Sequence, residues 1–388
     1  MLRKLLDNIE QIILSNDKLK KFHLLYDGLD TFLYSKNTQT TNAPYVRDSV
    51  DLKRTMIIVV LALLPSFIFG TYNVGLQSPE MTSSSFLDCF IFGLYKVLPM
   101  YLVVFAIGGL FEGLFVVVRK HEINEGFLVT GFLIPLTMPP TVPLWMLALA
   151  TIFGVVIGKE IFGGTGYNIF NPALTARAFL FFAYPSKMSG NIPWLFPADG
   201  LSKATPLLEV SSNIDKPFSE LSYSWSDMFF GYIPGSLGET STLAILIGAF
   251  ILIVTKIGSW RTMIATTIGM ILTSLLLMSL HKYGPCIFPD YKPGPMLAIN
   301  PFYHFVMGSF AFGMVFMATD PVSSAQTNIG RWYYGLLIGF MVVIIRCINP
   351  AYPEGMMLAI LFANAFAPLF DYNVIQNHIK KRQIRNEK

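Results

Sequence analysis

The chain consists of long apolar stretches separated by short segments that carry most of the charged residues. A helix needs about 20 apolar residues to cross the hydrocarbon core of a membrane. Stretches of that kind predict ten spanning helices, and the longest charge-free stretch, 127–158, divides into two spans at Pro139-Pro140. The other predicted spans cover residues 57–76, 97–118, 168–184, 241–256, 262–280, 303–318, 332–347 and 355–370.

Composition supports a membrane protein and excludes several other classes. Of the 388 residues, 53% are hydrophobic and 13% are charged, about half the charged fraction that is usual in a soluble domain. The mean hydropathy is +0.54. These values exclude a disordered chain, a coiled coil and an ordinary soluble enzyme. We therefore expect an all-α polytopic membrane protein, and a net charge of only +4 does not predict a nucleic-acid partner.

Lysine and arginine positions predict how the spans are oriented. These residues favour the cytoplasmic side, and about 20 of the 28 fall on that side when the N-terminus is cytoplasmic. No early apolar run of the signal-peptide kind precedes the first span. Both ends are therefore expected in the cytoplasm, with the chain in a bacterial inner membrane. The predicted parts are a cytoplasmic extension 1–54, a five-helix half 55–184, an outer (periplasmic) loop 185–240, a second five-helix half 241–371 and a basic tail 372–388.

A short motif indicates that the two halves are repeats. The pattern Gly-x5-Thr-x-Pro begins at Gly131 and again at Gly313, each time in the third span of its half. Because five is an odd number, the second half enters the membrane from the opposite face. Such inverted repeats tend to place their sites between the halves, near broken helices. Solute channels of the urea or ammonium type have this architecture, so a channel is one alternative function.

One run in the predicted outer loop differs from the spans: Asp-Gly-Leu-Ser-Lys-Ala-Thr-Pro-Leu at 199–207. Composition alone favours a surface turn, since Asp-Gly and Ser are turn formers and Pro206 stops a helix. The other interpretation is a modification site, in which the Thr205 hydroxyl carries a group attached from the outer compartment.

The run Ser202, Lys203, Ala204 and Thr205 resembles the flavinylation motif Ser/Thr-Gly-Ala-Thr of the NqrB family, which belongs to sodium-translocating NADH:quinone oxidoreductases. In that family the last Thr holds FMN through a phosphoester bond. Lys203 replaces the usual Gly, and a lysine there could help to neutralise the phosphate. Other stretches that are similar to the family are 42–54, 72–76, 119–127 and 170–173.

The resemblance implies a membrane flavoprotein subunit of a sodium-pumping NADH:quinone reductase. Electrons are expected to pass from covalent FMN through riboflavin to quinone, coupled to Na⁺ translocation. The chain has no dinucleotide-binding fingerprint, so NADH is expected to be oxidised on another subunit and the chain alone is not expected to be active. Expected partners are that flavoprotein subunit, a second subunit with covalent FMN, small membrane subunits, the flavin transferase and membrane lipid.

A related alternative is the RnfD protein of the Rnf ferredoxin:NAD complex, which would share Thr205 and the fold. The long basic N-terminal extension favours the NqrB family over this shorter relative. A covalent flavin would separate both redox proteins from a solute channel, because a channel has no use for one.

Three acidic residues toward the predicted cytoplasmic ends of spans, Glu112, Asp320 and Asp371, are candidates for the Na⁺ pathway. A charge at the centre of the membrane costs about 2.5–3.5 kcal/mol, and carboxylate oxygens suit a hard cation. The resemblance implies that acids at these places take up Na⁺. The alternatives are that Asp320 is a helix-end residue and that Asp371 lies at headgroup level.

The resemblance associates quinone with the region of Gly108, Gly109, Glu125, Gly126 and Phe127. The glycines would leave space for a flat ring and Phe127 would offer a stacking face. The alternative is that the glycines allow close packing of helices.

A Gly-rich run at 163–172 leads into a span at Asn171-Pro172 and is typical of a broken helix. Asn and Pro also suit an ordinary helix start. The family holds a non-covalent riboflavin in this subunit, and we expect Asn171, Arg177 and Thr130 near it. Arg177 lies inside a predicted span, so it needs a flavin or an acid as partner.

Overall fold

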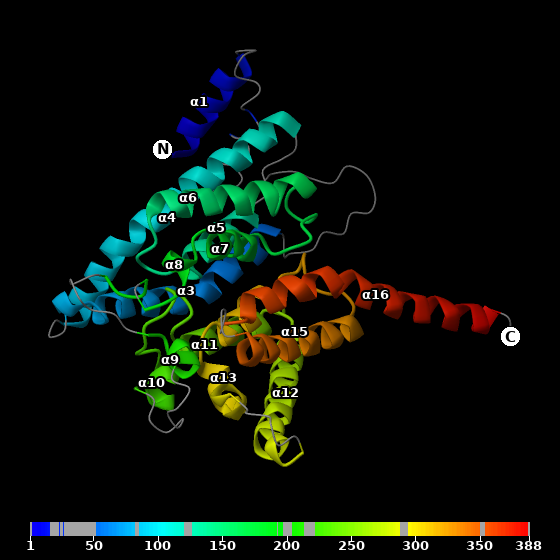
Figure 1. Cartoon of the computed structure of the whole chain (residues 1–388). Coiled ribbons are helices and arrows are strands. Elements are labelled where there is room, and N and C mark those ends of the chain that lie inside the picture. The colour runs from blue at the N-terminus through cyan, green and yellow to red at the C-terminus, as the bar shows by residue number, and fades with distance from the viewer. Residues whose placement is uncertain are drawn as a thin grey trace.

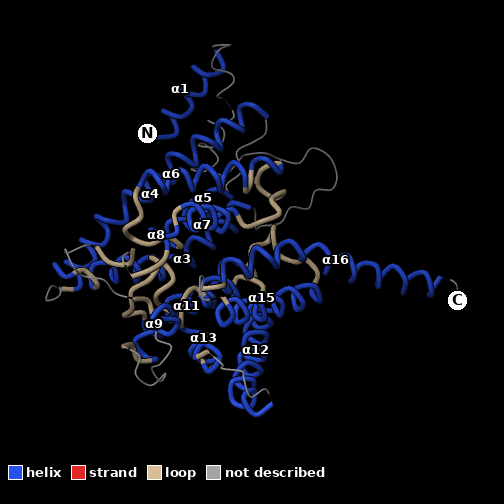
Figure 2. Tube along the Cα trace, viewed as in Figure 1, coloured by secondary structure: helices blue, strands red, loops and turns tan. Residues whose placement is uncertain are grey.

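The computed structural model describes residues 2–15, 23, 26, 52–81, 85–119, 126–191, 193–196, 204–212, 222–287, 294–349 and 354–386. This part of the chain is helical and contains no strand (Figure 2), which confirms the predicted all-α class. The longer elements are α1 (Leu2–Ser15), α3 (Leu52–Leu76), α4 (Phe86–Arg119), α5 (Gly126–Leu136), α6 (Leu144–Ile152), α7 (Pro172–Ala183), α11 (Thr242–Val254), α12 (Trp260–Ile287), α15 (Asn328–Ile348) and α16 (Met356–Asn386). The shorter ones are η2 (Pro79–Met81), η3 (Phe153–Ile157), η4 (Glu160–Phe162), α8 (Pro185–Met188), α9 (Pro206–Ser212), α10 (Trp225–Phe230), η6 (Pro295–Ala298), α13 (Pro301–Val306), α14 (Phe310–Phe312) and η7 (Gly313–Met317).

Within the described residues, six helical segments are long and apolar enough to cross a membrane: α3, α4, α6 with η3 and η4, α12, α15 and α16. The shorter apolar helices α5, α7 and α11 coincide with three further predicted spans. The predicted division at Pro139-Pro140 is confirmed, since α5 ends at Leu136 and α6 begins at Leu144. Predicted span 303–318 is instead shared by α13, α14 and η7. The total of ten crossings and the inversion of the halves stay predictions.

Corresponding helices pack together in the two predicted halves. The second span contacts the fourth, as α4 on α6 and α12 on α15, and the first contacts the third, as α3 on α5 and α11 on α14 and η7. Helices α3 and α11 join the halves. Helices α12 and α15 come close together at Gly339. A Cβ on this residue would lie only 2.1 Å from the Thr266 carbonyl oxygen. Small residues of this kind let membrane helices approach each other.

Arg346 holds the interrupted segment at 301–317. The segment breaks after α13, where Gly308 has a φ of +62°. The buried Arg346 guanidinium donates to the carbonyl oxygens of His304 and Met307 at 2.8 and 2.9 Å. Carbonyls freed by a helix break at membrane depth need such donors, because lipid offers none. A π-helical turn, η7, follows the break, and a second π-helical turn, η3, ends α6.

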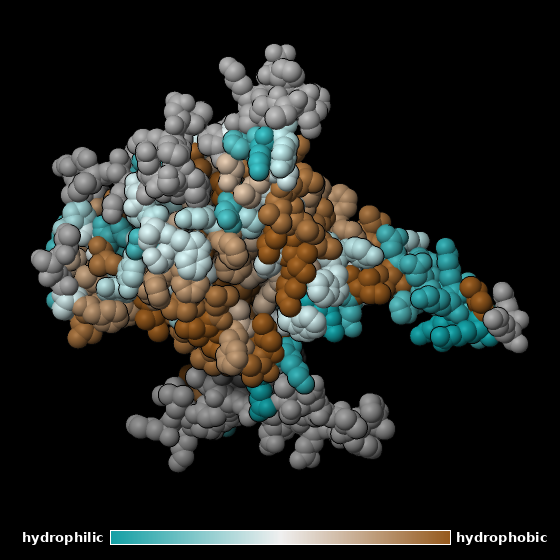
Figure 3. All heavy atoms as spheres, turned by 90° about the horizontal axis from the view of Figure 1, so that it is seen from below, coloured by the Kyte–Doolittle hydropathy of each residue, from teal (hydrophilic) through white to brown (hydrophobic). Residues whose placement is uncertain are grey.

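Apolar side chains cover much of the outside of the molecule. On α4, the side chains of Tyr95, Leu102 and Val118 are 72%, 62% and 68% exposed. Figure 3 shows hydrophobic residues over the centre of one face and hydrophilic residues on the end of α16 that extends away from the other helices (Figures 1 and 3). This surface is that of a multi-pass membrane protein, whose exposed apolar side chains contact lipid.

Candidate functional site

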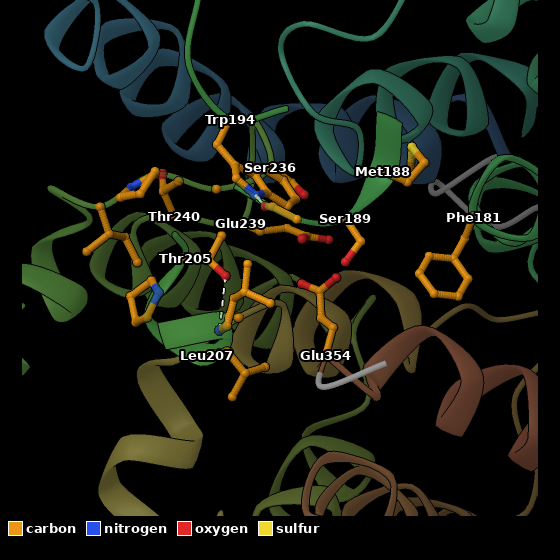
Figure 4. Close-up of a pocket in the computed structure, with 17 residues that line it drawn as sticks. Phe181, Met188, Ser189, Trp194, Thr205, Leu207, Ser236, Glu239, Thr240 and Glu354 are labelled. Atoms are coloured by element: carbon orange, nitrogen blue, oxygen red, sulfur yellow. Dashed lines mark hydrogen bonds between the residues drawn. The ribbon is translucent and has the colours of Figure 1, made fainter. Parts of the chain in front are cut away.

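Thr205 lies at the start of α9 and lines a cavity that we call the outer cavity (Figure 4). The Thr205 hydroxyl accepts a hydrogen bond from the Leu208 N–H at 3.3 Å, and its carbonyl accepts one from the Glu209 N–H at 2.9 Å. Thr205 therefore caps the helix, and Pro206 suits the first helical position because no N–H is needed there. The Thr205 side chain is also partly exposed, so the cap remains within reach of a modifying enzyme.

The wall of the outer cavity combines aromatic rings with two acids. Phe181 and Trp194 supply the rings, and Glu239 and Glu354 supply the acids. Figure 4 shows the two carboxylates pointing toward one another on the same side of the cavity. Phe181 lies on α7 and Trp194 between α8 and α9, whereas Glu239 lies in the loop before α11 and Glu354 just before α16. Segments far apart in the sequence therefore build one site.

Arg177, on α7, joins the two acids of the outer cavity. Its Nη1 donates to Glu239 Oε1 and its Nη2 to Glu354 Oε2. The side chains of Arg177 and Glu239 are each 5% exposed. Of the two partners predicted for Arg177, a flavin or an acid, the structure supplies the acid.

Glu239 lies in the loop before α11, outside the membrane-spanning segments. Burial raises the pKa of its carboxyl group to about 8, with the Arg177 guanidinium opposing the rise and the Glu354 carboxylate adding to it. Glu239 therefore holds a proton at neutral pH, because burial disfavours the charged form of an acid. With that proton in place, one negative charge faces the one positive charge of Arg177.

The outer cavity has a buried hydroxyl that lacks a hydrogen bond. The Thr240 Oγ1 has no partner within the described residues. Leaving such a group unsatisfied costs about 1–3 kcal/mol. Ligand cavities usually combine apolar and aromatic walls with a few polar groups that fix orientation. A flavin ring, which is planar and has polar edges, therefore fits the residues that are present.

A second cavity, which we call the inner cavity, lies at the N-terminal end of α7. Its wall includes Thr130, Asn171, Asp320 and Lys159. Two residues predicted near riboflavin, Thr130 and Asn171, are thereby brought together with one predicted for Na⁺, Asp320. Arg177, the third residue predicted near riboflavin, does not line this cavity, and its two carboxylate partners line the outer one.

Asn171 has two roles at once. Its Oδ1 accepts from the N–H groups of Ala173 and Leu174 at 3.0 and 3.3 Å, so it caps α7, as one interpretation of the Asn-Pro pair predicted. Its Nδ2 donates to Asp320 Oδ2 at 3.4 Å across the inner cavity. The cavity also has a buried hydroxyl, Thr165 Oγ1, without a hydrogen-bond partner within the described residues. These polar groups fit a ligand with both donors and acceptors, such as a flavin.

Glu112 is buried on α4 and forms an ion pair. The Nζ of Lys159 lies 2.7 Å from Glu112 Oε1 and 3.8 Å from Glu160 Oε1. The side chains of Lys159 and Glu160 are 2% and 1% exposed. The Arg119 Nη1 also approaches this cluster, at 3.9 Å from Glu160 Oε2. The Glu112 carboxylate is thus accommodated inside the protein by a lysine that runs beside the inner cavity.

The other two predicted Na⁺ residues have backbone partners. Asp320 accepts from the Val322 N–H at 3.1 Å and from the Ser323 hydroxyl at 2.8 Å. Asp371 accepts from the Thr327 N–H at 2.9 Å and from the Thr327 hydroxyl at 2.5 Å, just before α15 begins. Asp371 therefore ties α16 to the start of α15, away from the inner cavity that Asp320 lines.

Comparisons with known proteins identify the family. A family model described as "NQR2, RnfD, RnfE family" matches residues 39–380. The chain is 49% identical to the NqrB protein of the Na(+)-translocating NADH-quinone reductase of Ectopseudomonas mendocina (strain ymp), over 99% of each chain. It is 47% identical to the protein of the same name from Yersinia pestis, over 100% of each chain. The chain belongs to the NQR2, RnfD, RnfE family.

Membership of the NQR2, RnfD, RnfE family confirms the resemblance predicted from the Ser202–Thr205 motif and the other similar stretches. A third NqrB relative, from Chromohalobacter salexigens, is 47% identical over 99% of this chain and 97% of its own length. The similarity to NqrB proteins therefore extends over the whole chain, including the N-terminal segment that precedes the family-model match.

The residues predicted for quinone fall into two environments. A Cβ on Gly108 would lie 2.3 Å from the ring of Phe127, so the space above Gly108 is filled by that ring. Gly109 is exposed on α4, and a Cβ there would meet nothing within 4 Å. Gly126 packs on Thr165, which lines the inner cavity. Of these three glycines, Gly109 is the one that presents open space, on the outside of the helix.

Some predicted residues lie outside the described part of the chain, namely Ser202, Lys203 and Glu125. Ala204 is described and directly precedes Thr205. The residues that sequence reasoning missed are charged groups near the ends of spans: Lys159, Glu160, Glu239, Glu354 and Arg346. In the sequence, these residues stand out only by their position beside an apolar stretch. Charged residues at the surface occupy the same kind of position, so the signal does not separate the two.

Proposed function

We propose that the chain is the NqrB protein of a sodium-pumping NADH:quinone reductase, with FMN held covalently on Thr205. Electrons pass from this FMN through riboflavin to quinone, and their transfer is coupled to Na⁺ movement. The chain works with the other subunits of its complex, in the inner membrane of a bacterium and with both termini in the cytoplasm. The observation that carries the proposal is the position of Thr205, a partly exposed cap at the edge of a cavity that fits a flavin.

When bound, the flavins supply electron transfer, and the protein supplies binding and electrostatics. A phosphoester on the Thr205 hydroxyl leaves the ring free to enter the outer cavity. Phe181 and Trp194 can then contact the ring, and Thr240 can donate to one of its polar edges. Beside the ring, the charge is set by the protonated Glu239 and by Arg177 with its second partner, Glu354. Thr130, Asn171 and Thr165 would hold riboflavin in the inner cavity through their polar side-chain atoms.

Full-length similarity supports NqrB over the Rnf-type alternative. The family model covers proteins of both complexes, but the NqrB relatives align over 97–100% of their length, including the N-terminal segment. The channel alternative lacks support of this kind. We therefore assign NADH as the electron source of the complex, and quinone as the acceptor.

We assign quinone to the region of Gly108, Gly109, Gly126 and Phe127. Because Gly109 is open on the exposed side of α4, a lipid-soluble quinone can approach there from the bilayer. For Na⁺, we assign uptake to Glu112 and Asp320, with Asp371 tying α16 to the start of α15. The Asp320 carboxylate gives the inner cavity oxygen atoms of the kind that a hard cation prefers.

The first test is Thr205→Ala in the chain co-expressed with its flavin transferase. The native chain should gain the mass of FMN and fluoresce on a denaturing gel, and the variant should lose both signals. Ser224→Ala is the matched control, because Ser224 caps α10 in the same outer region but lines no described cavity. The variant Ser224→Ala should keep the flavin. The proposal is rejected if the native chain carries no covalent flavin. If the Thr205→Ala chain keeps its flavin, the flavin is attached to another residue.

A further inference from the structure

Lys159 is a buried cation placed between two acids. Its ammonium lies 2.7 Å from the carboxylate of Glu112 and 3.8 Å from that of Glu160. An ion taken out of water costs several kcal/mol unless it is paired at close range. The ammonium therefore accounts for how a charged carboxylate can be buried at Glu112.

Lys159 also connects Glu112 to the inner cavity, because it contacts the one and lines the other. Lys159 lines this cavity, together with Asp320, Thr130 and Asn171, whereas Glu112 does not. The Lys159 ammonium also lies 5.9 Å from the centre of the Phe127 ring. A cation in the inner cavity therefore lies next to the residue that neutralises the Glu112 carboxylate.

Glu160 offers the ammonium a second position. The Glu160 Oε2 is buried and has no hydrogen-bond partner within the described residues. The Arg119 Nη1 donates to the Glu160 carbonyl at 2.5 Å but stays 3.9 Å from this carboxylate oxygen. A lysine ammonium is a compact charge on a flexible stem, so it can move between neighbouring carboxylates without losing a partner.

We propose that Lys159 is a tethered cation that holds the Glu112 carboxylate when sodium is absent and moves to Glu160 when Na⁺ takes its place. This inference rests on the proposed function, in which Glu112 takes up Na⁺. Because the ammonium and Na⁺ compete for one carboxylate, Lys159 sets the sodium concentration that the pump requires. Lys159 acts as a positioning residue, since it affects Na⁺ binding through the Glu112 carboxylate.

The test compares variants of the assembled complex in proteoliposomes, with NADH-driven quinone reduction measured against sodium concentration. Lys159→Met keeps the length of the side chain and removes its charge. It should lower the sodium concentration for half-maximal turnover about tenfold, because a close competing charge has gone. Arg119→Met is the matched control, since it removes a positive charge from the same cluster that does not contact Glu112 in the described pairs. Its effect should stay within about twofold.

Two further variants separate the ways in which the inference can fail. Glu112→Gln should raise the half-saturating sodium concentration. If it leaves that value unchanged, the role of Glu112 in the proposed function fails, and this inference fails with it. If Glu112→Gln has its effect but Lys159→Met matches Arg119→Met, only the tethered cation is rejected.

The flavin content and the assembly of each variant are measured as controls for correct folding. Lys159→Met leaves Glu112 buried without its cation, so the complex carrying it could fail to assemble. In that case Lys159→Arg decides, because a guanidinium grips a carboxylate through two donors and is harder to displace. It should raise the half-saturating sodium concentration severalfold, and an unchanged value would overturn the inference.

Discussion

Arg177 is one cation that faces two acids, and the balance is completed by a proton on Glu239. Burial holds the pKa of the Glu239 carboxyl near 8, well above its ordinary value of 4.5. The folded protein thus binds this proton more tightly than the unfolded chain does. The stabilisation that results is complete below about pH 4.5 and is lost as the pH rises toward about 8. Protonation at one side chain therefore links the stability of the outer cavity to pH.

Glu239→Gln should remove this dependence, because a glutamine keeps the shape of the protonated acid and cannot ionise. Between about pH 5 and about pH 8, the melting temperature of the native chain in detergent should fall more than that of the variant. Glu80→Gln, at an exposed position, is the control and should follow the native chain. An equal fall for Glu239→Gln and the native chain would show that Glu239 is not the titrating group.

The need for a partner at Arg177 could be predicted from the sequence, but the partner could not. A guanidinium inside an apolar stretch requires an acid or a ligand. Glu239 and Glu354 lie 62 and 177 positions away, in segments that look like ordinary loops. Only the packing of the two halves brings them together. For the same reason Lys159 looks like a surface charge in the sequence, although its side chain is 2% exposed.

At the scale of the element, apolar patterning located the helices but not their interruptions. Residues 301–317 are as apolar as an unbroken span, and the break at Gly308 depends on Arg346, which is far along the chain and donates to the carbonyls of the break. The division at Pro139-Pro140 was predictable because proline ends a helix through its own chemistry. Local breakers are visible in a sequence, whereas breaks supported by distant side chains are not.

The closely packed pair α12 and α15 should be sensitive to a single methyl group. In Gly339→Ala the new Cβ would meet the backbone of α12 at 2.1 Å, so the helices must separate, at a cost of about 1–3 kcal/mol. The complex should melt at a lower temperature. Gly109→Ala is the matched control on α4, where the Cβ meets nothing within 4 Å and stability should not fall. If Gly109 faces quinone as proposed, Gly109→Ala should raise the KM for quinone while leaving the melting temperature unchanged. Equal melting temperatures for both variants would contradict the packing role of Gly339.

At the scale of the whole molecule, the outer and inner cavities lie near opposite ends of α7. Asn171 caps the start of this helix in the inner cavity, and Phe181 near its end lines the outer one. Ten residues of helix rise about 15 Å. The charge bias of the sequence predicts that the outer cavity faces the periplasm and the inner cavity faces the cytoplasm.

Cysteine labelling can test the predicted sidedness. Single cysteines at Ser212 and Gln383, both exposed, are introduced after Cys89, Cys286 and Cys347 have been replaced by serine. A membrane-impermeant maleimide should label Ser212→Cys in intact spheroplasts and Gln383→Cys only after permeabilisation. Labelling of both before permeabilisation would contradict the predicted placement of the outer loop and the tail on opposite sides of the membrane.

The π-helical turn at η3 has a consequence for how the chain tolerates change in length. Its bond from the Gly158 N–H to the Phe153 carbonyl spans five residues, one more than in an α-helix. The extra residue turns everything that follows by about 100° relative to a regular helix. Lys159 comes directly after it. Deleting one residue between Phe153 and Ile157 would leave the apolar composition of the helix almost unchanged, yet would rotate the lysine away from Glu112. The ion pair of Lys159 with Glu112 therefore depends on the number of residues in this turn and not on their apolar character.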